Sequence, residues 1–486
     1  MQTLYNSRQI RAIERRHAHL DLMERAGLAT AELARDLVAD GLSILVVAGP
    51  GNNGGDALVA ARHLRQRWHR VDVVFAGDAA KLSGTARNAL EAWHACGGGL
   101  LEQIPAGTAY GLVIDGLFGL GLGKPLQDEY AGLVDRINGL DTTVLSIDLP
   151  SGICADTGRV LGCAVVADHT LTFIGLKPGL FTLDGPDHAG RIHLCDLGLD
   201  TATADEITGT LLDHPPALAA PRKRNSHKGS YGSIGVLGGD HAMCGAALMA
   251  GRAALHAGAG RVFVGLLAEN APPVDSGQPE LMLRPPRALL DIDHLSALAV
   301  GPGMGRSNHA LGILRRALHY PAPLLLDADA LHLVATEPEL VQLCKSRPHA
   351  NVMTPHPAEA AALLGCSLDA IQADRIAAAC RIAQTYDAVT VLKGCGSVIA
   401  TPDGRWSING SGNPGLASAG TGDVLSGIIA GLLAQGLAAA SAALTGVYLH
   451  GAAADSLVAA GVGPIGLTAT ELMPETRDLL NRWMTS

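Results

Sequence analysis

Short apolar runs alternate with amphipathic stretches along the first 200 residues of the chain. The runs are continuously apolar, which is typical of strands buried on both faces of a sheet. Helical stretches such as 56–68 and 84–96 lie between them. This repetition predicts a parallel sheet with right-handed crossovers, covered by helices. The predicted strands are 43–49, 71–77, 110–116, 142–148 and 168–174.

The same pattern resumes in the second half of the chain. Between the halves, around residues 200–225, Ala, Thr, Pro and charged residues dominate and no period holds, so we place a domain boundary there. We therefore expect an α/β domain over 1–210 and a second α/β domain over 222–486. The strands predicted for the second domain are 233–239, 260–267, 297–303, 323–329, 351–355 and 389–394.

One uncharged run, residues 427–449, is long enough to span a bilayer. It is dominated by Ala and Gly, and Gln435-Gly436 interrupts it. We predict two helices buried in a protein core at this place and no membrane partner.

Composition narrows the class of protein. Of the 486 residues, 48% are hydrophobic and 17% are charged, which excludes general disorder. The net charge of −10 disfavours nucleic acid as a partner. The basic run Arg222–Lys228 is interpreted as a solvated linker.

The nine cysteines are scattered, and no two of them have CxxC spacing. We expect reduced thiols in a cytoplasmic protein, without a zinc site or a disulfide framework. The first twenty residues lack the apolar core of a signal peptide.

A glycine-rich segment, "AGPGNNGGDALVAARHL" (48–64), follows the first predicted strand of the first half. Glycines let a backbone turn tightly and approach a ligand, and the start of the next helix carries partial positive charge. The segment suits phosphate groups, although such a segment can also be only a turn. It is not the dinucleotide pattern GxGxxG, because two asparagines interrupt it.

Polar residues follow other strands of the same half. Asp115 and Asp148 each end a predicted strand, and Ser151 comes just after the second of them. Loops at the carboxyl ends of neighbouring parallel strands line one crevice. Asn53, Asp115 and Ser151 therefore suit a cation as hard oxygen ligands, which leaves Asp148 free for proton transfer. The alternative is that the two aspartates only cap helices or form turns.

The segments "GNNGGD", "IDGLFGLGLGKPL" and "IDLPSG", in this order, resemble the epimerase domain that acts on hydrated nicotinamide cofactors. The resemblance implies a Rossmann-like three-layer fold, K⁺ held by Asn53, Asp115 and Ser151, and Asp148 as acid/base and substrate-binding residue. Lys124 stands where arginine is common, which retains the charge but loses bidentate phosphate geometry. The other residues implied to contact the hydrated dinucleotide are Asn52, Asn53, Gly54, Gly55, Asp56, Gly119, Leu120, Gly121, Leu122, Gly123, Lys124 and Pro125.

In the second half, "NPGLASAGTGDVLSG" (413–427) leads into a predicted apolar helix. Gly420 and Gly422 free the backbone to present amide groups as an anion site. Asp423 would repel an anion bound there, and Ser or Thr would serve better as a simple cap. The arrangement favours an aspartate that acts on a hydroxyl group brought next to a phosphate.

This segment resembles the ribokinase-like superfamily. Taken with "VGPGMG" (300–305), "DADAL" (327–331), "TPHPAEAAALLG" (354–365) and "LKGCGSVIA" (392–400), it resembles the nucleotide-dependent dehydratase of hydrated nicotinamide cofactors. The residues implied to contact the hydrated nicotinamide are Ala246, Gly303, Gly305, His356 and Asp423. Those implied to contact the nucleotide are Lys393, Gly394, Cys395, Gly396, Ser397 and Gly422.

The resemblance implies a bifunctional repair enzyme that acts on hydrated NADH and NADPH. Its epimerase domain would interconvert the R and S forms. In the dehydratase domain, Asp423 would activate the C6 hydroxyl of the S form, which takes the terminal phosphoryl of ADP, or of ATP, with Mg²⁺ present. Departure of phosphate would restore the reduced cofactor and leave AMP when ADP is the donor.

We also expect a homo-oligomer. Two alternatives stay open at this point: a ribokinase-like small-molecule kinase, and a first domain that only binds ligands or serves as a scaffold.

Overall fold

The structure is a computed structural model that describes residues 1–38, 41–82, 84–201, 209–216 and 222–485. The chain divides into two compact units. The N-terminal unit is Thr3–Gly209, and the C-terminal unit combines Met1–Gln2 with Thr210–Ser486. Part of the irregular stretch in which we placed the domain boundary, residues 202–208 and 217–221, lies outside the described residues.

The N-terminal unit is built on a six-stranded sheet of order β3-β2-β4-β5-β6-β7. Every neighbouring pair in this sheet is parallel, as the continuously apolar runs predict. The sequence missed β7, whose residues are only partly buried. The strands are β2 (Ser43–Ala48), β3 (Val71–Phe75), β4 (Tyr110–Gly116), β5 (Val144–Ile147), β6 (His169–Phe173) and β7 (Arg191–Cys195).

Helices cover both faces of this sheet. Alternate residues of a strand point to opposite faces, so Ile44 and Val46 pack in one core and Leu45 and Val47 in another. The first core includes residues of α1, α2, α3 and α4, and the second includes residues of α5. These helices are α1 (Ser7–Arg16), α2 (Leu22–Leu37), α3 (Asn52–Gln66), α4 (Gly84–Ala95) and α5 (Asp128–Asn138), and a short α6 is Gly185–Ala189. The predicted three-layer α/β/α arrangement is confirmed.

The C-terminal unit has an eleven-stranded sheet of order β1-β8-β17-β16-β15-β14-β13-β12-β9-β10-β11. The pairs from β11 to β15 are parallel, whereas β16 pairs antiparallel with both β15 and β17. The strands are β1 (Gln2–Leu4), β8 (Gly209–Leu212), β9 (Ser233–Gly238), β10 (Arg261–Leu266), β11 (Met282–Arg284), β12 (Ala297–Val300), β13 (Leu324–Leu326), β14 (Asn351–Met353), β15 (Ala388–Leu392), β16 (Val398–Ala400) and β17 (Trp406–Asn409).

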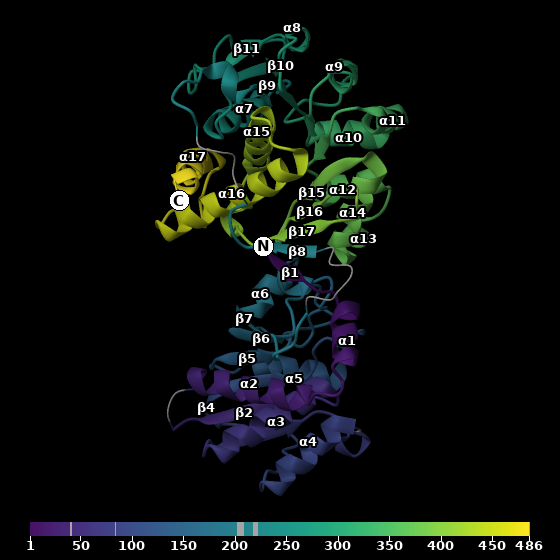
Figure 1. Ribbon diagram of the computed structural model, residues 1–486, viewed down its shortest axis with the longest axis vertical. Helices are drawn as coiled ribbons and strands as arrows, with labels where there is room; N and C mark the ends of the chain where they lie inside the picture. The colour runs from purple at the N-terminus through teal and green to yellow at the C-terminus, as the bar shows by residue number, and fades with distance from the viewer. Residues whose placement is uncertain (39–40, 83, 202–208, 217–221, 486) are drawn as a thin grey trace. The chain divides into compact units, whose positions relative to one another are not determined.

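The helices of this unit fall into two groups, one on each side of the sheet (Figure 1). One group, α7, α15, α16 and α17, forms a core with residues of the central strands. It comprises α7 (Cys244–His256), α15 (Thr421–Ala434), α16 (Ala439–Ala459) and α17 (Ala469–Thr485). The remaining helices are α8 (Pro286–Leu290), α9 (Asn308–Leu318), α10 (Asp329–Thr336), α11 (Pro338–Ser346), α12 (Pro357–Leu364), α13 (Leu368–Ala373) and α14 (Arg375–Tyr386).

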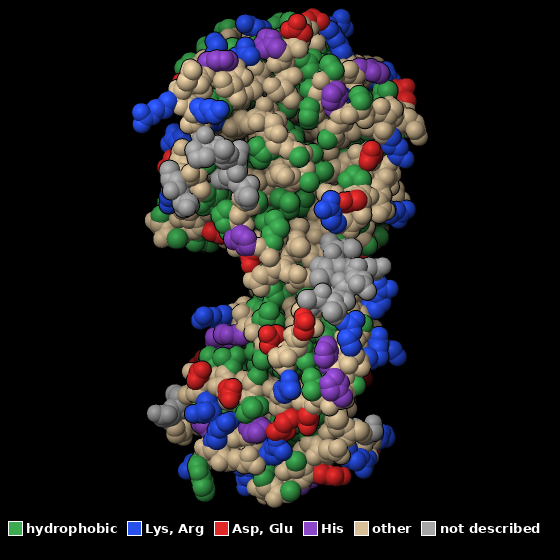
Figure 2. All heavy atoms as spheres, viewed as in Figure 1, with side chains coloured by type: hydrophobic (Ala, Val, Ile, Leu, Met, Phe, Trp, Pro, Cys, Tyr) green, Lys and Arg blue, Asp and Glu red, His purple; other side chains and the backbone are tan. Residues whose placement is uncertain are grey.

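The long apolar run 427–449 falls on α15 and α16, so the prediction of two buried helices is confirmed. Gln435 and Gly436 lie between them, and Gly436 has a φ of 92°, which ends the helical backbone. No helix within the described residues is long and apolar enough to cross a membrane. On the face in Figure 2, charged side chains of this unit lie mainly toward its rim, and hydrophobic side chains gather along its middle.

Candidate functional site

The N-terminal unit contains a cavity of about 920 Å³, which we call the first cavity. Its lining comes from loops at the carboxyl ends of β2, β4, β5 and β6, and from α1, α2 and the segment between these helices. The predicted residues that line it are Asn52, Asn53, Asp56, Gly119, Leu120, Gly121, Leu122 and Asp148. The parallel sheet therefore brings these segments to one edge.

The glycine-rich segment differs from the expectation in one respect. Helix α3 begins at Asn52, four residues before the predicted start, so Asn52–Gly55 form its first turn. A Cβ on Gly54 would lie 1.8 Å from the carbonyl oxygen of Gly49, and one on Gly55 would lie 2.5 Å from Cε of Met23. These two glycines thus allow α3 to pack closely against the backbone of Gly49 and the side chain of Met23. Neither glycine lines the cavity. Gly123, Lys124 and Pro125 lie outside the lining as well.

Asp148 occupies the centre of the polar part of the first cavity. Its φ of 67° is a left-handed conformation that few side chains adopt without cost. Lys177 places its ammonium 2.5 Å from Asp148 Oδ1, and the amide of Leu120 donates to Asp148 Oδ2 at 3.1 Å. The lysine also donates to Thr172 and to the Phe173 carbonyl. Asp148 thus belongs to an ion pair that was not predicted from the sequence.

Lys177 was missed in the sequence, where it stands in "FIGLKPGL". Its side chain is only 1% exposed. Removing an ammonium group from water is costly unless it is paired and hydrogen-bonded. The sequence nevertheless offered one indication of this residue. A lysine inside an apolar run needs a buried partner if the run is buried.

Three further carboxyl groups line the first cavity: Glu14 of α1, Asp56 of α3, and Asp21, which accepts from the amide of Glu24 as the N-cap of α2. The side chains of Glu14 and Asp56 have no hydrogen-bond partner within the described residues. Burial, followed by the charge of Asp148, raises the pKa of Glu14. Burial, then Asp148 and Glu14, raises the pKa of Asp56 well above its ordinary value. Glu14 was not selected from the sequence.

The residues predicted to hold a cation lie beside this cavity. Asp115 is fully buried and accepts hydrogen bonds from Ser146 Oγ at 2.8 Å and from Ser151 Oγ at 2.6 Å. The backbone amides of Ser151 and Leu117 also donate to it. These hydrogen bonds lower the pKa of Asp115, but the effect of burial is larger, so its pKa is raised overall. Asn53 is buried too, and its Nδ2 atom has no hydrogen-bond partner within the described structure.

The C-terminal unit contains a second cavity of about 380 Å³. Of the predicted residues, Ala246, Gly303 and Asp423 line it. Gly305 lies at its margin, where its amide donates to Asp329 Oδ2 at 2.9 Å. Asp329, Arg306 and Glu359 complete the polar lining, and the sequence did not single them out.

Asp423 lies in the first turn of α15 and does not cap it. The N-cap is Gly420, in left-handed conformation with a φ of 88°, and no side chain caps the helix. Within the described residues, the Asp423 carboxylate accepts no hydrogen bond. Burial, followed by the charge of Asp327, raises the pKa of Asp423 to about 6. This group can therefore accept a proton near neutral pH.

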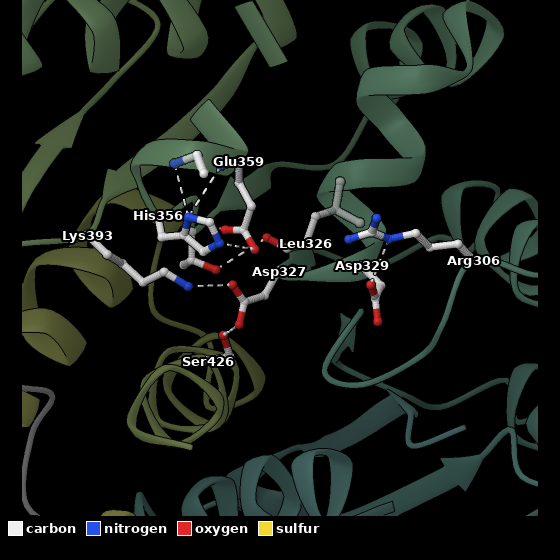
Figure 3. Close-up of polar contacts among 10 residues, drawn as sticks. Arg306, Leu326, Asp327, Asp329, His356, Glu359, Lys393 and Ser426 are labelled. Atoms are coloured by element: carbon white, nitrogen blue, oxygen red, sulfur yellow. Dashed lines mark hydrogen bonds and ion pairs between the residues drawn. The ribbon is translucent and has the colours of Figure 1, made fainter. Parts of the chain in front are cut away.

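Asp327 and Lys393, both of which affect the pKa of Asp423, belong to a buried network that Figure 3 shows. Lys393 Nζ is 2.8 Å from Asp327 Oδ1, and Ser426 of α15 donates to Asp327 Oδ2 at 2.7 Å. Burial lowers the pKa of Lys393, but the charges of Asp327 and of other carboxylates raise it by more, so its pKa is raised overall. A Cβ on Gly422 would lie 3.5 Å from Lys393 Nζ, so the lysine stands at the start of α15. The sequence missed the role of Asp327, although it lies in "DADAL".

His356 has a structural position that differs from the expectation. It is the N-cap of α12, where its Nδ1 accepts from the amide of Ala358, and it is not part of the cavity lining. Burial and then Lys393 lower the pKa of His356. Glu359, which closes the same capping box, lines the cavity instead, and burial raises its pKa to about 7 (Figure 3).

The other residues predicted to contact a nucleotide lie outside the cavity lining. Gly394, Cys395, Gly396 and Ser397 form the connection between β15 and β16. Gly394 has a φ of 140°, and Arg375 beside it donates to the carbonyls of Leu392 and Lys393. The connection starts at the lysine of the buried network.

Backbone strain gathers at both cavities. Asp148 and Ile174 line the first cavity with positive φ, and Ala242 and Ala328 line the second with positive φ. For a β-branched residue such as Ile174, whose φ is 68°, this conformation is a clear outlier. Strain of this kind persists where the surroundings enforce it, commonly at functional sites.

Comparison with protein families divides the chain in the same order. Residues 19–179 match the family described as YjeF-related protein N-terminus. Residues 234–476 match the family described as NAD(P)H-hydrate dehydratase. The first cavity lies mainly in the first match, and the second cavity lies wholly in the second.

Two relatives align over nearly the whole chain. The bifunctional NAD(P)H-hydrate repair enzyme of Escherichia coli (strain K12) is 39% identical over 95% of this chain and 89% of its own length. That of Coxiella burnetii is 39% identical over 99% of this chain and 100% of its own. One similar solved structure is the ADP/ATP-dependent NAD(P)H-hydrate dehydratase of Bacillus subtilis, crystallised with ATP and Mg²⁺. It is 32% identical in sequence, and the match covers 55% of this chain and 94% of the Bacillus chain, with a TM-score of 0.49.

Proposed function

The chain belongs to the family of bifunctional NAD(P)H-hydrate repair enzymes, and we propose that each of its two cavities carries one step of the repair. The first cavity interconverts the R and S forms of hydrated NADH or NADPH. The second removes water from the S form with ADP or ATP as the phosphoryl donor. The observation that carries the proposal is one aspartate in each cavity, Asp148 and Asp423, within the segments that match the two families.

In the first cavity, Asp148 is the proton acceptor. The ammonium of Lys177 and the amide of Leu120 hold the two oxygens of its carboxylate in place, at 2.5 and 3.1 Å. The first turn of α3, with Asn52 and Asn53 in the lining, offers backbone amides to a dinucleotide phosphate. Leu120–Leu122 form a further wall for the ligand.

In the second cavity, Asp423 takes the proton of the C6 hydroxyl as the phosphoryl group is transferred to that oxygen. Its carboxylate is unpaired within the described residues, and its pKa of about 6 leaves it ionised at neutral pH. Lys393 and the uncapped start of α15 stabilise negative charge on the transferred group. Phosphate then leaves C6, and the double bond of the reduced nicotinamide is restored.

Mg²⁺ belongs to this second step, since it neutralises the charge of phosphates during transfer. Within the described residues, no three His, Cys, Asp or Glu side chains form a metal site by themselves. Mg²⁺ commonly uses one or two carboxylates together with substrate phosphates. Glu359 and Asp329 line the cavity and supply ligands of that type, so the residues fit the ion.

K⁺ is the cation we propose for the first unit, with Asn53, Asp115 and Ser151 as its ligands. The donor set is rich in oxygen, and Asp115 and Ser151 lie 2.6 Å apart. The unpaired Nδ2 of Asn53 is a buried polar atom that the protein itself leaves unsatisfied. Since amide N and O can be exchanged by rotation, that position can also hold an oxygen ligand.

The nine cysteines are all free thiols, which suits a reducing compartment, and we propose a cytoplasmic location. The expected homo-oligomer remains a prediction.

The proposal is tested with the purified chain, the S form of the hydrated cofactor, Mg²⁺, and ADP, ATP or no nucleotide. We expect reduced cofactor and free phosphate in equal amounts, only when a nucleotide is present. The faster nucleotide identifies the donor. A phosphorylated product that accumulates without release of phosphate would contradict the proposal and favour a small-molecule kinase.

A further inference from the structure

The first cavity holds more carboxyl groups than cations to balance them. Glu14, Asp21, Asp56 and Asp148 line it, and Asp21 is engaged by the amide of Glu24. Among the groups that can carry positive charge, Lys177 is already engaged by Asp148 at 2.5 Å, and Arg11 is exposed and donates to the Leu120 carbonyl. His19 also lines the cavity and is exposed. Like charges confined to one site disfavour the ionisation of one another.

Helix α1 holds Glu14 in a fixed place. Ile10 and Ile13 of this helix are buried in the core of the N-terminal unit, and Glu14 follows on that side. The start of α1 is fixed by Ser7, whose amide and hydroxyl each donate to Asp156 at 2.6 Å.

The same helix contacts the loop that orients Asp148. Arg11 Nη2 donates to the Leu120 carbonyl at 3.3 Å, and the Leu120 amide donates to Asp148 Oδ2 at 3.1 Å. Glu14 stands one helical turn from Arg11 and lines the same cavity as Asp148. A carboxyl group without a partner is thus held beside one that is paired.

Exchange of R and S forms needs such a pair. The C6–O bond must break on one face of the ring and form again on the other. Hydroxide is a poor leaving group, so departure requires an acid, and the addition of water requires a base.

We propose that Glu14 is the catalytic proton donor to the departing C6 hydroxyl, with Asp148 as the acceptor from the incoming water. This inference rests on the epimerase function proposed for the first cavity. As the C6–O bond breaks, the lone pair of ring N1 forms an N1=C6 double bond, and the hydroxyl leaves as water with the proton of Glu14. Water then adds to the opposite face, the electron pair returns to N1, and the proton of that water passes to Asp148. Return of this proton from Asp148 to Glu14 through solvent restores the starting protonation state, so no net water or proton is consumed.

The surroundings of Glu14 favour its protonated form. Burial and then Asp148 raise its pKa, and Lys177, Arg11 and Arg15 oppose that shift. Burial, then Asp148 and Glu14, also raises the pKa of Asp56. Asp56 lies in the first part of α3, within the segment proposed to bind the dinucleotide, whereas Glu14 lies on the helix whose Arg11 contacts the Leu120 loop. We therefore assign the donor to Glu14.

The test compares Glu14→Gln with the intact protein at a series of pH values, measuring exchange between separated R and S forms. We expect kcat for exchange to fall about 100-fold, with little change in KM and with loss of the alkaline limb of the pH profile. Glu14→Asp should restore part of the rate. Dehydration of the S form in the same variant should be unchanged, and partial rescue by Glu14→Asp shows that the N-terminal unit tolerates substitution at this position.

Glu32→Gln is the matched control, because Glu32 is an exposed glutamate of α2 outside the cavity lining. It should leave exchange unchanged. In water enriched in ¹⁸O, each inversion should introduce one labelled oxygen, and inversion without label would overturn the proposed route.

Exchange by Glu14→Gln within threefold of the intact protein, with the same pH profile, would overturn the assignment. Loss of the alkaline limb in Asp56→Asn alone would overturn it as well, in favour of Asp56. If the intact protein exchanges the two forms no faster than they exchange in buffer, the epimerase function itself fails, whatever Glu14 does.

Discussion

At the scale of single residues, Asp148 and Asp423 have opposite surroundings. Asp148 is held by the buried ammonium of Lys177 at 2.5 Å. Asp423 has no hydrogen-bond partner within the described residues, and it is near Asp327, a carboxylate of the same sign. Asp148 is thus positioned by an ion pair, whereas burial and then Asp327 raise the pKa of Asp423.

The setting of Asp423 predicts the pH dependence of dehydration. Because its pKa is raised to about 6, kcat/KM should rise by about tenfold per pH unit below pH 6 and level off above it. The measurement is the initial rate of reduced-cofactor formation from the S form. A rate independent of pH from 5 to 7 would contradict a base with this pKa.

Asp423→Asn should abolish dehydration and also stabilise the protein at neutral pH. A carboxyl group whose pKa is raised by folding favours the protonated folded state, so stability is lost as pH rises from the unfolded value through about 6. The variant removes that loss, and its Tm at neutral pH should exceed that of the intact protein. A Tm below that of the intact protein would show that Asp423 has a structural role.

At the scale of elements, the start of α15 matters most. Gly420 begins the helix in left-handed conformation, and no side chain occupies the cap. The first amides therefore face the approach to Lys393 and Asp423, where a phosphate would lie.

Gly422→Ala tests this helix start. Gly422 has no left-handed φ, and its Cβ would meet Lys393 Nζ at 3.5 Å, an ordinary contact. We expect the free energy of unfolding to rise by up to about 1 kcal/mol. The KM for the nucleotide should rise on the order of tenfold, because the added methyl group hinders the approach of a phosphate to the first amides of α15, an effect comparable to losing about one hydrogen bond.

Gly312→Ala is the matched control for this variant. Gly312 is exposed in α9, and a Cβ there would meet no atom within 4 Å. It should raise stability by a similar amount and leave the KM unchanged. Equal nucleotide KM values in the two variants would exclude phosphate binding at the start of α15.

The elements could largely be predicted from the sequence, because buried parallel strands are continuously apolar. The strands missed were those without that pattern, such as β7, which is only partly buried, and β16 and β17, which form an antiparallel hairpin at the side of the parallel strands. The start of α3 was misplaced because glycines normally end a helix, whereas Gly54 here lets α3 pack against Gly49.

The site could be predicted only where a residue stands in a recognisable segment. Asp148 and Asp423 stand in such segments. Lys177 and Asp327 have partners that lie far away in the sequence. Lys177 pairs with Asp148, 29 positions away, and Asp327 pairs with Lys393, 66 positions away. Glu14 reaches the cavity only through the packing of α1.

At the scale of the whole molecule, one chain carries two cavities with complementary tasks. Hydration of the nicotinamide at C6 gives two forms, and a stereospecific dehydratase uses one of them. An epimerase in the same chain makes the other form available, so that all of the damaged cofactor is recovered.

The most direct test of this account follows the near-ultraviolet absorbance of reduced nicotinamide after a mixture of R and S forms is given to the chain with nucleotide, Mg²⁺ and K⁺. The account predicts full recovery by the intact protein, recovery by Asp148→Asn that halts near the fraction of the S form, and no recovery by Asp423→Asn. Full and equally fast recovery by Asp148→Asn would contradict the assignment of epimerisation to the first cavity.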